Sequence, residues 1–241
     1  MVAGILSRPL FSPREVNRTK PRALKFRREE KVSRISAILL GAGQSKRMGV
    51  DKLSLPWGRK TMLEHCFETL LRSEVQEVVV VLSARNKATR DLFKGRRVKI
   101  VINPLSKMGM STSIRRGLQK IRRRGQGILI ALGDQPFLKT RTIDALIRIF
   151  DQGKGGIIVP SFQGRRGHPV IFHRKFEREL RNLKGDAGGR SIIEGHPEDV
   201  RVVPVRSIGV VKDVDTRPAY NPPLSLPLRW GEDKGKRRTK R

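Results

Sequence analysis

The sequence is poor in cysteine and aromatic residues and contains no long apolar run. Cys66 is the only cysteine, so no disulfide can form within the chain, and a reducing cytoplasm is the expected location. No stretch reaches the roughly 20 apolar residues that a transmembrane helix needs. The four histidines lack zinc-ligand spacing, and one tyrosine and two tryptophans form no aromatic RNA-binding signature. We therefore expect no disulfide scaffold, no membrane span, no zinc site and no RNA-recognition domain.

Acidic residues are scarce: 22 Asp and Glu stand against 53 Lys and Arg, which gives a net charge of +31. Residues 1–34 hold ten Lys and Arg against three acids, and residues 221–241 hold seven against two, so most of the charge lies between them. A positive field of this kind attracts anionic ligands such as nucleotides and phosphorylated small molecules. Nucleic acid is expected to bind only nonspecifically.

The two ends of the chain differ in composition from the part between them. Residues 1–34 are basic and lack a sustained apolar segment, so we expect a disordered extension, or a start codon placed too early, rather than a targeting peptide. Prolines at 222, 223 and 227 mark the end of the folded part, and a disordered basic tail is expected over residues 221–241. This leaves residues 35–220 as one domain, which is long enough for a sizeable core.

Short apolar runs alternate with helical patterns along this domain. The expected strands are residues 35–40, 78–82, 98–102, 128–132, 157–160, 170–172 and 202–205. The expected helices are residues 62–71, 144–150 and 175–183, with another that begins near Ser111 and has Ile114, Leu118 and Ile121 on one face. Alternation of this kind predicts an α/β fold with a mostly parallel sheet and helices on both faces.

The segment after the first expected strand, LGAGQSKRMGVDK from Leu40 to Lys52, is the most informative in the chain. Its glycines let the backbone turn tightly and approach a ligand, and the cations Lys46, Arg47 and Lys52 follow. It is not a Walker A loop, and Lys46 stands where the dinucleotide fingerprint needs a third glycine. A strand that ends in a glycine turn rimmed by cations predicts a phosphate-binding loop. The alternative is a surface loop with scattered basic residues.

Two further strand-and-turn units follow. In ILIALGDQP, from Ile128 to Pro136, an acid lies at the carboxyl end of a strand, where open parallel sheets bind ligands. The carboxylate of Asp134 is well placed there to hold Mg²⁺ between nucleotide phosphates. The other unit comes earlier in the chain: a strand ends at Asn103-Pro104, and the segment GMSTSI (109–114) follows. Ser111 or Thr112 is expected to cap the helix that begins there.

Together these motifs resemble the nucleotidyltransferase family that includes the molybdenum cofactor cytidylyltransferases and guanylyltransferases. The glycine loop matches Leu-x-Ala-Gly-x-Ser-x-Arg-Met-Gly-x-x-Lys, and the turn at Asp134 matches the metal-binding Gly-Asp-x-Pro. The segments RRGHPVIF (165–172) and LKGDAGGR (183–190) resemble the half of the family domain that faces the acceptor. The late motif Asp213-Val214-Asp215-Thr216 resembles one that returns to the metal. The resemblance covers about residues 35–220.

The resemblance implies a three-layer α/β/α, nucleotide-diphospho-sugar-transferase-like (Rossmann-like) fold and a set of roles. Asp134 and Asp215 would hold Mg²⁺, with Asp213 as a neighbour, and Arg47, Lys52 and Asp134 would be catalytic. The nucleotide-binding residues it implies are Leu40, Gly41, Ala42, Gly43, Ser45, Arg47, Lys52, Asn103, Ser111, Thr112 and Ser113. The acceptor-binding residues it implies are Gly167, His168, Pro169 and Asp186.

The implied reaction moves a nucleotidyl group from an NTP to a phosphate of the acceptor and releases pyrophosphate. In the most similar branch the donor is CTP and the acceptor is molybdenum-molybdopterin, with a molybdoenzyme or its chaperone as a further partner. Ala42, Gln135 and the Gly167-His168-Pro169 segment favour CTP over GTP, whereas Gly41 matches neither branch. Three alternatives stay open: another phosphorylated acceptor, a module that only binds and delivers a nucleotide or cofactor, and a nucleic-acid-associated protein that acts through its basic ends.

Overall fold

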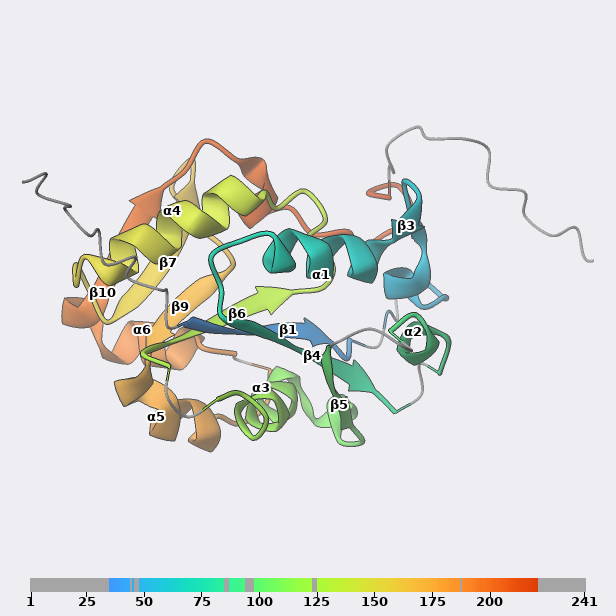
Figure 1. The fold of residues 1–241 in the computed structure, drawn as a ribbon, viewed down its shortest axis with the longest axis horizontal. Helices are drawn as coiled ribbons and strands as arrows, with labels where there is room; N and C mark the ends of the chain where they lie inside the picture. Colours follow the sequence, from blue (N-terminus) through green and yellow to red (C-terminus); the bar gives the residue numbers. More distant parts are fainter. Residues whose placement is uncertain are drawn as a thin grey trace, which may run out of the picture. The chain divides into compact units, whose positions relative to one another are not determined.

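The computed structural model describes residues 35–43, 45, 48–84, 87–93, 98–122, 125–186 and 188–220. These residues form an eight-stranded sheet with helices on both faces, together with a small two-stranded hairpin (Figure 1). None of the described helices is long and apolar enough to cross a membrane. The predicted basic extension and tail lie outside the described residues, so the domain boundaries stay predictions.

The main sheet is mixed. Its strands are β1 (Ile35–Gly41), β4 (Glu77–Ser83), β5 (Lys99–Asn103), β6 (Gly127–Leu132), β7 (Ile157–Phe162), β8 (Arg165–Arg166), β9 (Val170–His173) and β10 (Val200–Pro204). Their order is β10-β7-β9-β6-β1-β4-β5, with β8 paired to β7. The pairs β6/β1, β1/β4, β4/β5 and β7/β10 are parallel, and β9 runs antiparallel between β6 and β7. The predicted mostly parallel sheet is confirmed, and each expected strand is present with ends within two residues.

Helices connect the strands. They are α1 (Met62–Leu71), α2 (Lys87–Asp91), α3 (Met110–Leu118), α4 (Thr140–Asp151), α5 (Glu177–Asn182) and α6 (Arg190–Gly195). Short 3₁₀ turns are η1 (Lys52–Ser54), η2 (Ser106–Met108), η3 (Arg174–Phe176), η4 (Pro197–Asp199) and η5 (Ile208–Val210), and the hairpin is β2 (Pro56–Trp57) with β3 (Lys60–Thr61). The expected helix over 175–183 is instead η3 followed by the shorter α5, and α4 begins four residues before its expected start.

The core has two layers, one on each face of the sheet. All seven residues of β1 are buried, as expected for a central parallel strand that is covered on both sides. Ile35, Ala37 and Leu39 pack with residues of α1 and α4, whereas Ile38 and Leu40 pack with residues of α3, α5 and α6. Figure 1 shows α1 and α4 above the sheet and α3 and α5 below it. The three-layer α/β/α arrangement expected from the sequence is confirmed.

Helix α1 shows how local sequence fixes an element of this fold. The Thr61 hydroxyl accepts from the Glu64 amide at 3.3 Å, and the Glu64 carboxylate accepts from the Thr61 amide at 3.0 Å. This reciprocal capping box satisfies amides that the first turn leaves without helical partners. Cys66, Phe67 and Leu70 are buried on one face, so the expected bounds and apolar face of this helix are confirmed.

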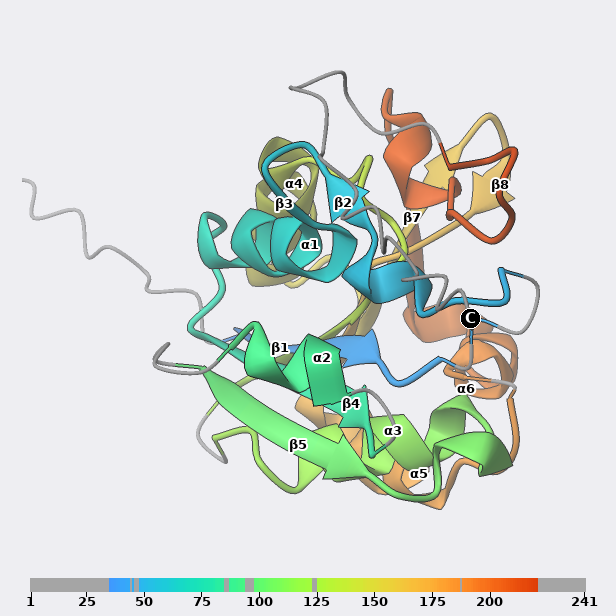
Figure 2. The same cartoon turned by 90° about the vertical axis from the view of Figure 1, so that its right-hand side faces the viewer.

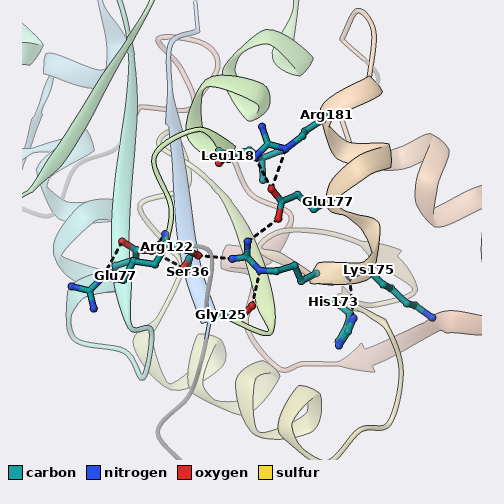
Figure 3. Close-up of polar contacts among 10 residues, drawn as sticks. Ser36, Glu77, Leu118, Arg122, Gly125, His173, Lys175, Glu177 and Arg181 are labelled. Atoms are coloured by element: carbon teal, nitrogen blue, oxygen red, sulfur yellow. Dashed lines mark hydrogen bonds and ion pairs between the residues drawn. The ribbon is translucent and has the colours of Figure 1, made fainter.

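A polar network closes the edge of the sheet where β1 and β4 begin (Figure 3). The Ser36 hydroxyl donates to Glu77 at 2.7 Å, and Lys99 Nζ donates to the same carboxylate at 2.6 Å. Arg174 donates to the carbonyl oxygen of Gly125 at 2.6 Å and to the Glu177 carboxylate at 2.7 Å. The opposite edge, where the parallel strands end, is left for the loops that carry the sequence motifs.

Candidate active site

The loops at the carboxyl ends of β1, β5 and β6 surround a cavity of about 460 Å³. Figure 2 looks onto this end of the sheet, with α2 and the β2–β3 hairpin in front. The cavity is lined by Leu40, Ala42, Gly43, Ser45, Lys52, Leu53, Ser106, Gly109, Met110, Ser113, Leu132, Asp134, Asp186, Asp213 and Asp215. Open α/β sheets bind ligands at this edge, so the position agrees with the expectation from the sequence.

The glycine loop forms one wall of the cavity. Ser45 has a positive φ of 48°, its carbonyl oxygen accepts from the Met48 amide at 3.0 Å, and its hydroxyl accepts from the Lys52 amide at 3.2 Å. Ser45 therefore ties the loop to the start of η1. Two of the predicted phosphate-binding cations, Lys46 and Arg47, lie outside the described residues.

Gly41 does not line the cavity. A Cβ on this residue would lie 3.0 Å from Leu82 Cδ2 and 3.3 Å from Leu63 Cδ1, so the position faces packed apolar side chains. Its departure from both branches of the family thus falls on the core side of the strand. The predicted nucleotide-binding neighbours Leu40, Ala42 and Gly43 all line the cavity.

Lys52 joins the two carboxylates predicted to hold a metal. Its Nζ lies 2.6 Å from Asp134 Oδ2 and 2.6 Å from Asp215 Oδ1, and its side chain is 9% exposed. Burial alone would lower the pKa of Lys52, but the charges and hydrogen bonds of Asp134 and Asp215 raise it above its usual value. Lys52 is therefore a permanent cation in this arrangement.

The backbone of Gly133, the residue before Asp134, is held by two hydrogen bonds. The Gly133 amide donates to the Leu40 carbonyl oxygen at 2.9 Å, which links the ends of β6 and β1. The Cys66 thiol donates to the Gly133 carbonyl oxygen at 3.4 Å, and burial raises the pKa of this thiol far above its usual value. Cys66 is therefore a packed, protonated support and not a nucleophile.

The other oxygen of Asp134 is available to a ligand. Its Oδ1 is buried and has no hydrogen-bond partner among the described residues. A buried carboxylate oxygen without a partner is costly unless something occupies it, and carboxylate oxygens are the ligands that Mg²⁺ and Mn²⁺ prefer. Asp134 and Asp215, brought together at one ammonium, thus fit a divalent cation.

A segment near the end of the described chain supplies the second carboxylate. Val214 is fully buried against Trp57 and Met62, and its amide donates to the Asp134 carbonyl oxygen at 2.9 Å. Asp213 and Asp215, on either side of Val214, both line the cavity. Partial burial raises the pKa of Asp213, and the negative charges of Asp215 and Asp134 raise it further.

Residues 211–220, which we call the strap, run from η5 to Tyr220 beside the β2–β3 hairpin. The Tyr220 ring lies 6.2 Å from the Trp57 ring, and its hydroxyl donates to the Pro56 carbonyl oxygen. Lys212 Nζ lies 4.2 Å from the centre of the Phe137 ring, an attractive cation–π arrangement. The strap is therefore anchored along its length.

Asn103 organises the loop before α3 from below the cavity. It is fully buried, and its Nδ2 donates to Thr112 Oγ1 at 2.8 Å and to Ser113 Oγ at 2.9 Å. Of the predicted nucleoside-binding side chains, Ser113 lines the cavity, whereas Asn103, Ser111 and Thr112 do not. These three residues are placed to support the wall of the cavity.

The predicted cap of α3 is wrong. The helix begins at Met110, so Ser111 and Thr112 lie inside its first turn, where Thr112 donates back to the Gly109 carbonyl oxygen at 2.8 Å. Asp186 Oδ1 accepts from the Met110 amide at 2.8 Å instead, and the Gly185 carbonyl oxygen accepts from the Ser111 amide at 3.1 Å. A contact across 76 residues replaces a local cap, which sequence spacing could not reveal.

The four residues predicted to face the acceptor are not brought to one place. Asp186 lines the cavity, but Gly167, His168 and Pro169 do not. Gly167 packs on η5, where a Cβ would lie 2.0 Å from the Val210 carbonyl oxygen, and the His168 amide donates to that oxygen at 2.8 Å. Burial lowers the pKa of His168, and the charge of Asp134 offsets this only in part.

Some lining residues escaped the sequence analysis. Ser106 lies on the cavity wall, and its hydroxyl donates to Ser83 Oγ at 3.3 Å. Met110 and Leu53 add apolar lining. Only Met110 had a signal, since it belongs to the GMSTSI segment, and Ser106 and Leu53 stand in short turns without a recognisable pattern.

A three-layer α/β domain with paired carboxylates beside a glycine loop defines the class of nucleotide-binding transferases. Comparison with known proteins gives the family: residues 37–200 match the MobA-like NTP transferase domain. The chain belongs to this family and is a nucleotidyltransferase.

Several relatives carry different names. Nicotine blue oxidoreductase of Paenarthrobacter nicotinovorans is 30% identical over 76% of this chain and 92% of its own. A protein named probable molybdenum cofactor guanylyltransferase, from Pyrococcus furiosus, is 30% identical over 81% and 87%. Molybdenum cofactor cytidylyltransferase of Escherichia coli is 28% identical over 58% and 70%. These names share the family but not one donor or acceptor.

One similar protein of known structure contains a metal. The Rv0371c protein of Mycobacterium tuberculosis, in complex with manganese, is 27% identical over 77% of this chain and 95% of its own, with a TM-score of 0.65. The similarity supports the fold, and the manganese belongs to that similar protein.

Proposed function

We propose that this nucleotidyltransferase moves CMP from CTP to molybdenum-molybdopterin and releases pyrophosphate. The proposal depends most on one observation: Asp134 and Asp215 meet at Lys52, each 2.6 Å from its Nζ, beside a glycine loop. The acceptor phosphate is itself a nucleophile, so no residue has to form a covalent intermediate. The protein must align two anions and offset their repulsion.

Asp134 and Asp215 would hold the divalent cation, for which we favour Mg²⁺. The support is the orphaned Asp134 oxygen, the oxygen-only donor set and the manganese complex of a relative. When bound, such a cation neutralises phosphate oxygens and stabilises the charge that develops in the transition state. The cavity needs this help, because its described lining carries four aspartates and one lysine.

The chain's own residues would orient the nucleotide. Ala42, Gly43 and Ser45 of the glycine loop line the cavity, and the backbone amides of such a loop suit phosphate oxygens. Lys52 and Arg47 would stabilise the pyrophosphate leaving group, although Arg47 lies outside the described residues. Ser113 lies on the wall where the nucleoside would bind.

The choice of CTP depends on Ala42, Gln135 and the Gly167-His168-Pro169 segment, which resemble the cytidylyltransferase branch. Ala42 lines the cavity, whereas Gln135 is buried with its Oε1 unpartnered among the described residues. Gly41, the one departure in the loop, faces packed side chains and so leaves the cytidylyltransferase assignment intact. GTP is the second candidate donor, because relatives named guanylyltransferases match this chain at comparable identity.

The acceptor assignment comes from the relatives' names and from the resemblance of the second half of the chain. A molybdoenzyme or its chaperone would receive the product. Another phosphorylated acceptor is the main alternative, since one relative is named for purine catabolism and another as an oxidoreductase. A pure delivery module would need none of the metal carboxylates.

The direct test incubates the purified protein with Mg²⁺, molybdenum-loaded molybdopterin and either CTP or GTP, and measures pyrophosphate and dinucleotide. We expect product with CTP and at least a tenfold lower rate with GTP. The reverse preference would assign the protein to the guanylyltransferase branch. Absence of product with both would overturn the proposed acceptor.

A further inference from the structure

Lys52 occupies the position where a metal would be expected. Its Nζ touches one oxygen of each carboxylate at the same distance of 2.6 Å, and the side chain is almost fully enclosed. The three residues come from η1, the turn after β6 and the strap, so the ammonium is the point at which these segments meet. In this arrangement, the protein neutralises its own metal carboxylates.

Lys52 and a divalent cation cannot share this position. A magnesium ion on these two carboxylates would lie about 2.0–2.1 Å from its ligand oxygens, whether it takes Asp134 Oδ1 or the oxygens that Lys52 holds. It would then lie beside an ammonium group, and the repulsion between these charges is strong in a partly dry cavity. Removing the ammonium first would leave buried carboxylates unpaired, which is also costly. The cation must therefore displace Lys52 as it enters.

Only the side chain of Lys52 has to move. Its amide is held by Ser45 Oγ at 3.2 Å, and η1 is capped by Asp51, whose other oxygen accepts from Thr89 at 2.5 Å. The backbone is thus fixed, while four rotatable bonds leave the ammonium free to swing. The same Ser45 contact places Lys52 next to the loop where phosphates would bind.

Charge decides where the ammonium goes. The described cavity wall holds four aspartates and no cation besides Lys52. No other described positive group on the wall therefore repels the ammonium of Lys52. A triphosphate adds a strongly negative group on the glycine-loop side. It would stabilise Lys52 away from the carboxylates, just as the metal takes its position.

We propose that Lys52 is a resident counter-cation that the divalent metal replaces, so that metal and nucleotide bind cooperatively. This inference rests on the proposed function and adds to it that metal binding depends on the nucleotide. Metal alone binds weakly because it must expel Lys52 without a new partner for the ammonium. Metal with nucleotide binds tightly because the phosphates receive Lys52.

The test measures Mn²⁺ binding by the electron paramagnetic resonance of free Mn²⁺, with and without CTP and without acceptor. A protein-free titration measures the Mn²⁺ that CTP alone holds, and this amount is subtracted. We expect Lys52→Met to bind Mn²⁺ alone at least tenfold more tightly than the wild type. The factor by which CTP tightens Mn²⁺ binding should be smaller in Lys52→Met than in the wild type by a similar amount. Couplings between two sites are typically about 5–150-fold.

Lys99→Met is the matched control. Lys99 Nζ lies 2.6 Å from Glu77 Oε2 at the opposite edge of the sheet, so its removal deletes the same charge from another ion pair. It should leave both Mn²⁺ affinities at their wild-type values. If Lys52→Met does not fold, Lys52→Gln keeps a hydrogen-bond donor near the carboxylates and should show the same gain.

Two outcomes separate this inference from the function beneath it. If Asp134→Asn loses Mn²⁺ but Lys52→Met binds it no more tightly than the wild type, the counter-cation role is wrong and the metal site stands. If Mn²⁺ binding is the same in the wild type, Asp134→Asn and Lys52→Met, both the inference and the proposed metal site fail.

Discussion

Asp134 and Asp215 are 82 and 163 residues away from Lys52 in the sequence, yet both contact its ammonium at 2.6 Å. Each of the three residues follows a short motif that sequence analysis could recognise. What the motifs did not reveal is that the predicted phosphate-binding lysine and the predicted metal ligands are direct partners. Their contact makes the lysine part of the proposed metal site before any ligand arrives.

The first prediction concerns Asp134→Asn. Turnover should fall by about 10²–10³-fold, the size found when one electrostatic stabiliser of a transition state is removed. The melting temperature should fall only modestly, because Lys52 loses the charge of Asp134 but keeps its ion pair with Asp215, and the asparagine still offers an amide oxygen. Measurement of kcat from pyrophosphate release, together with a thermal melt, checks both statements.

Asp144→Asn provides the comparison for this variant. Its Oδ1 accepts from the Glu74 amide at 2.9 Å on the surface, away from the cavity lining. It should keep wild-type turnover. An Asp134→Asn protein with turnover close to that of Asp144→Asn would remove Asp134 from the mechanism.

Among the elements, the strap shows how apolar packing positions charge. Val214 is fully buried between two aspartates that line the cavity, and Trp57 is 4% exposed in the same cluster. Val214 is buried while Asp213 and Asp215 on either side of it line the cavity, so its burial holds both aspartates at the cavity wall. The aromatic cluster thus fixes the position of a proposed metal ligand, Asp215, through the neighbouring Val214.

The second prediction is that Val214→Ala weakens metal binding as well as stability. The free energy of unfolding should fall by about 1–3 kcal/mol, as expected for two buried methyl groups and the space they leave. Mn²⁺ affinity in the presence of CTP should fall at least fivefold. In a Trp230→Phe background, Trp57 fluorescence should shift to the red, and it reports on the strap directly.

Val159→Ala is the matched control for this effect. Val159 is 1% exposed in β7 and does not line the cavity. It should lose similar stability but keep its Mn²⁺ affinity. Equal losses of affinity in the two valine variants would mean that general loosening, not the strap, explains the result.

The third prediction concerns the start of β4. Burial raises the pKa of Glu77, but hydrogen bonds from Lys99, the Arg122 amide and Ser36 outweigh it and hold the pKa below its ordinary value of 4.5. A lowered pKa stabilises the fold above the unfolded value, and this contribution is lost as pH falls through the folded pKa.

Glu77→Gln should therefore cost about 1–3 kcal/mol at pH 7, as for loss of a buried charge-assisted hydrogen bond. The difference from the wild type should shrink as pH falls below 4.5. Urea unfolding of both proteins at pH 7 and at pH 3.5 measures this. A difference that stays constant with pH would show that Glu77 contributes through packing alone.

For the molecule as a whole, the charge is spread unevenly. The chain carries +31, but the described lining of the cavity carries four aspartates against one lysine. The outer field can attract an anionic nucleotide from a distance, while the inner wall rejects it unless a cation accompanies it. Long-range attraction of the nucleotide should therefore depend on salt, whereas its entry into the cavity should depend on the divalent cation.

The fourth prediction is that truncation to residues 35–220 leaves transferase activity within about threefold of the full chain, since this range holds every cavity-lining residue that the structure describes. Nonspecific RNA binding should weaken strongly, because the two ends carry 17 of the 53 Lys and Arg. Filter binding and kcat measured on the same preparations test this. Loss of activity with retained folding would give the basic ends a role in the reaction.

The sequence predicted the layers and the carboxyl edge because these follow from local apolar runs and from motifs that end strands. It did not predict the direction of β9, which depends on how a short strand inserts between β6 and β7. Nor did it predict that Asp186 caps α3, because that contact joins segments 76 residues apart. Local signals indicated Lys52, Asp134 and Asp215, whereas only the fold shows that these three groups contact one another.

One measurement tests the central claim most directly: the anomalous scattering of Mn²⁺ in crystals grown with a CTP analogue that cannot be cleaved between its α and β phosphates. The account predicts a manganese peak bound by oxygens of Asp134 and Asp215, with Lys52 displaced towards the phosphates. A peak at His196, Glu198 and Asp199 instead, where ligand atoms lie within 4.8 Å of one another, with Lys52 still on both carboxylates, would contradict it.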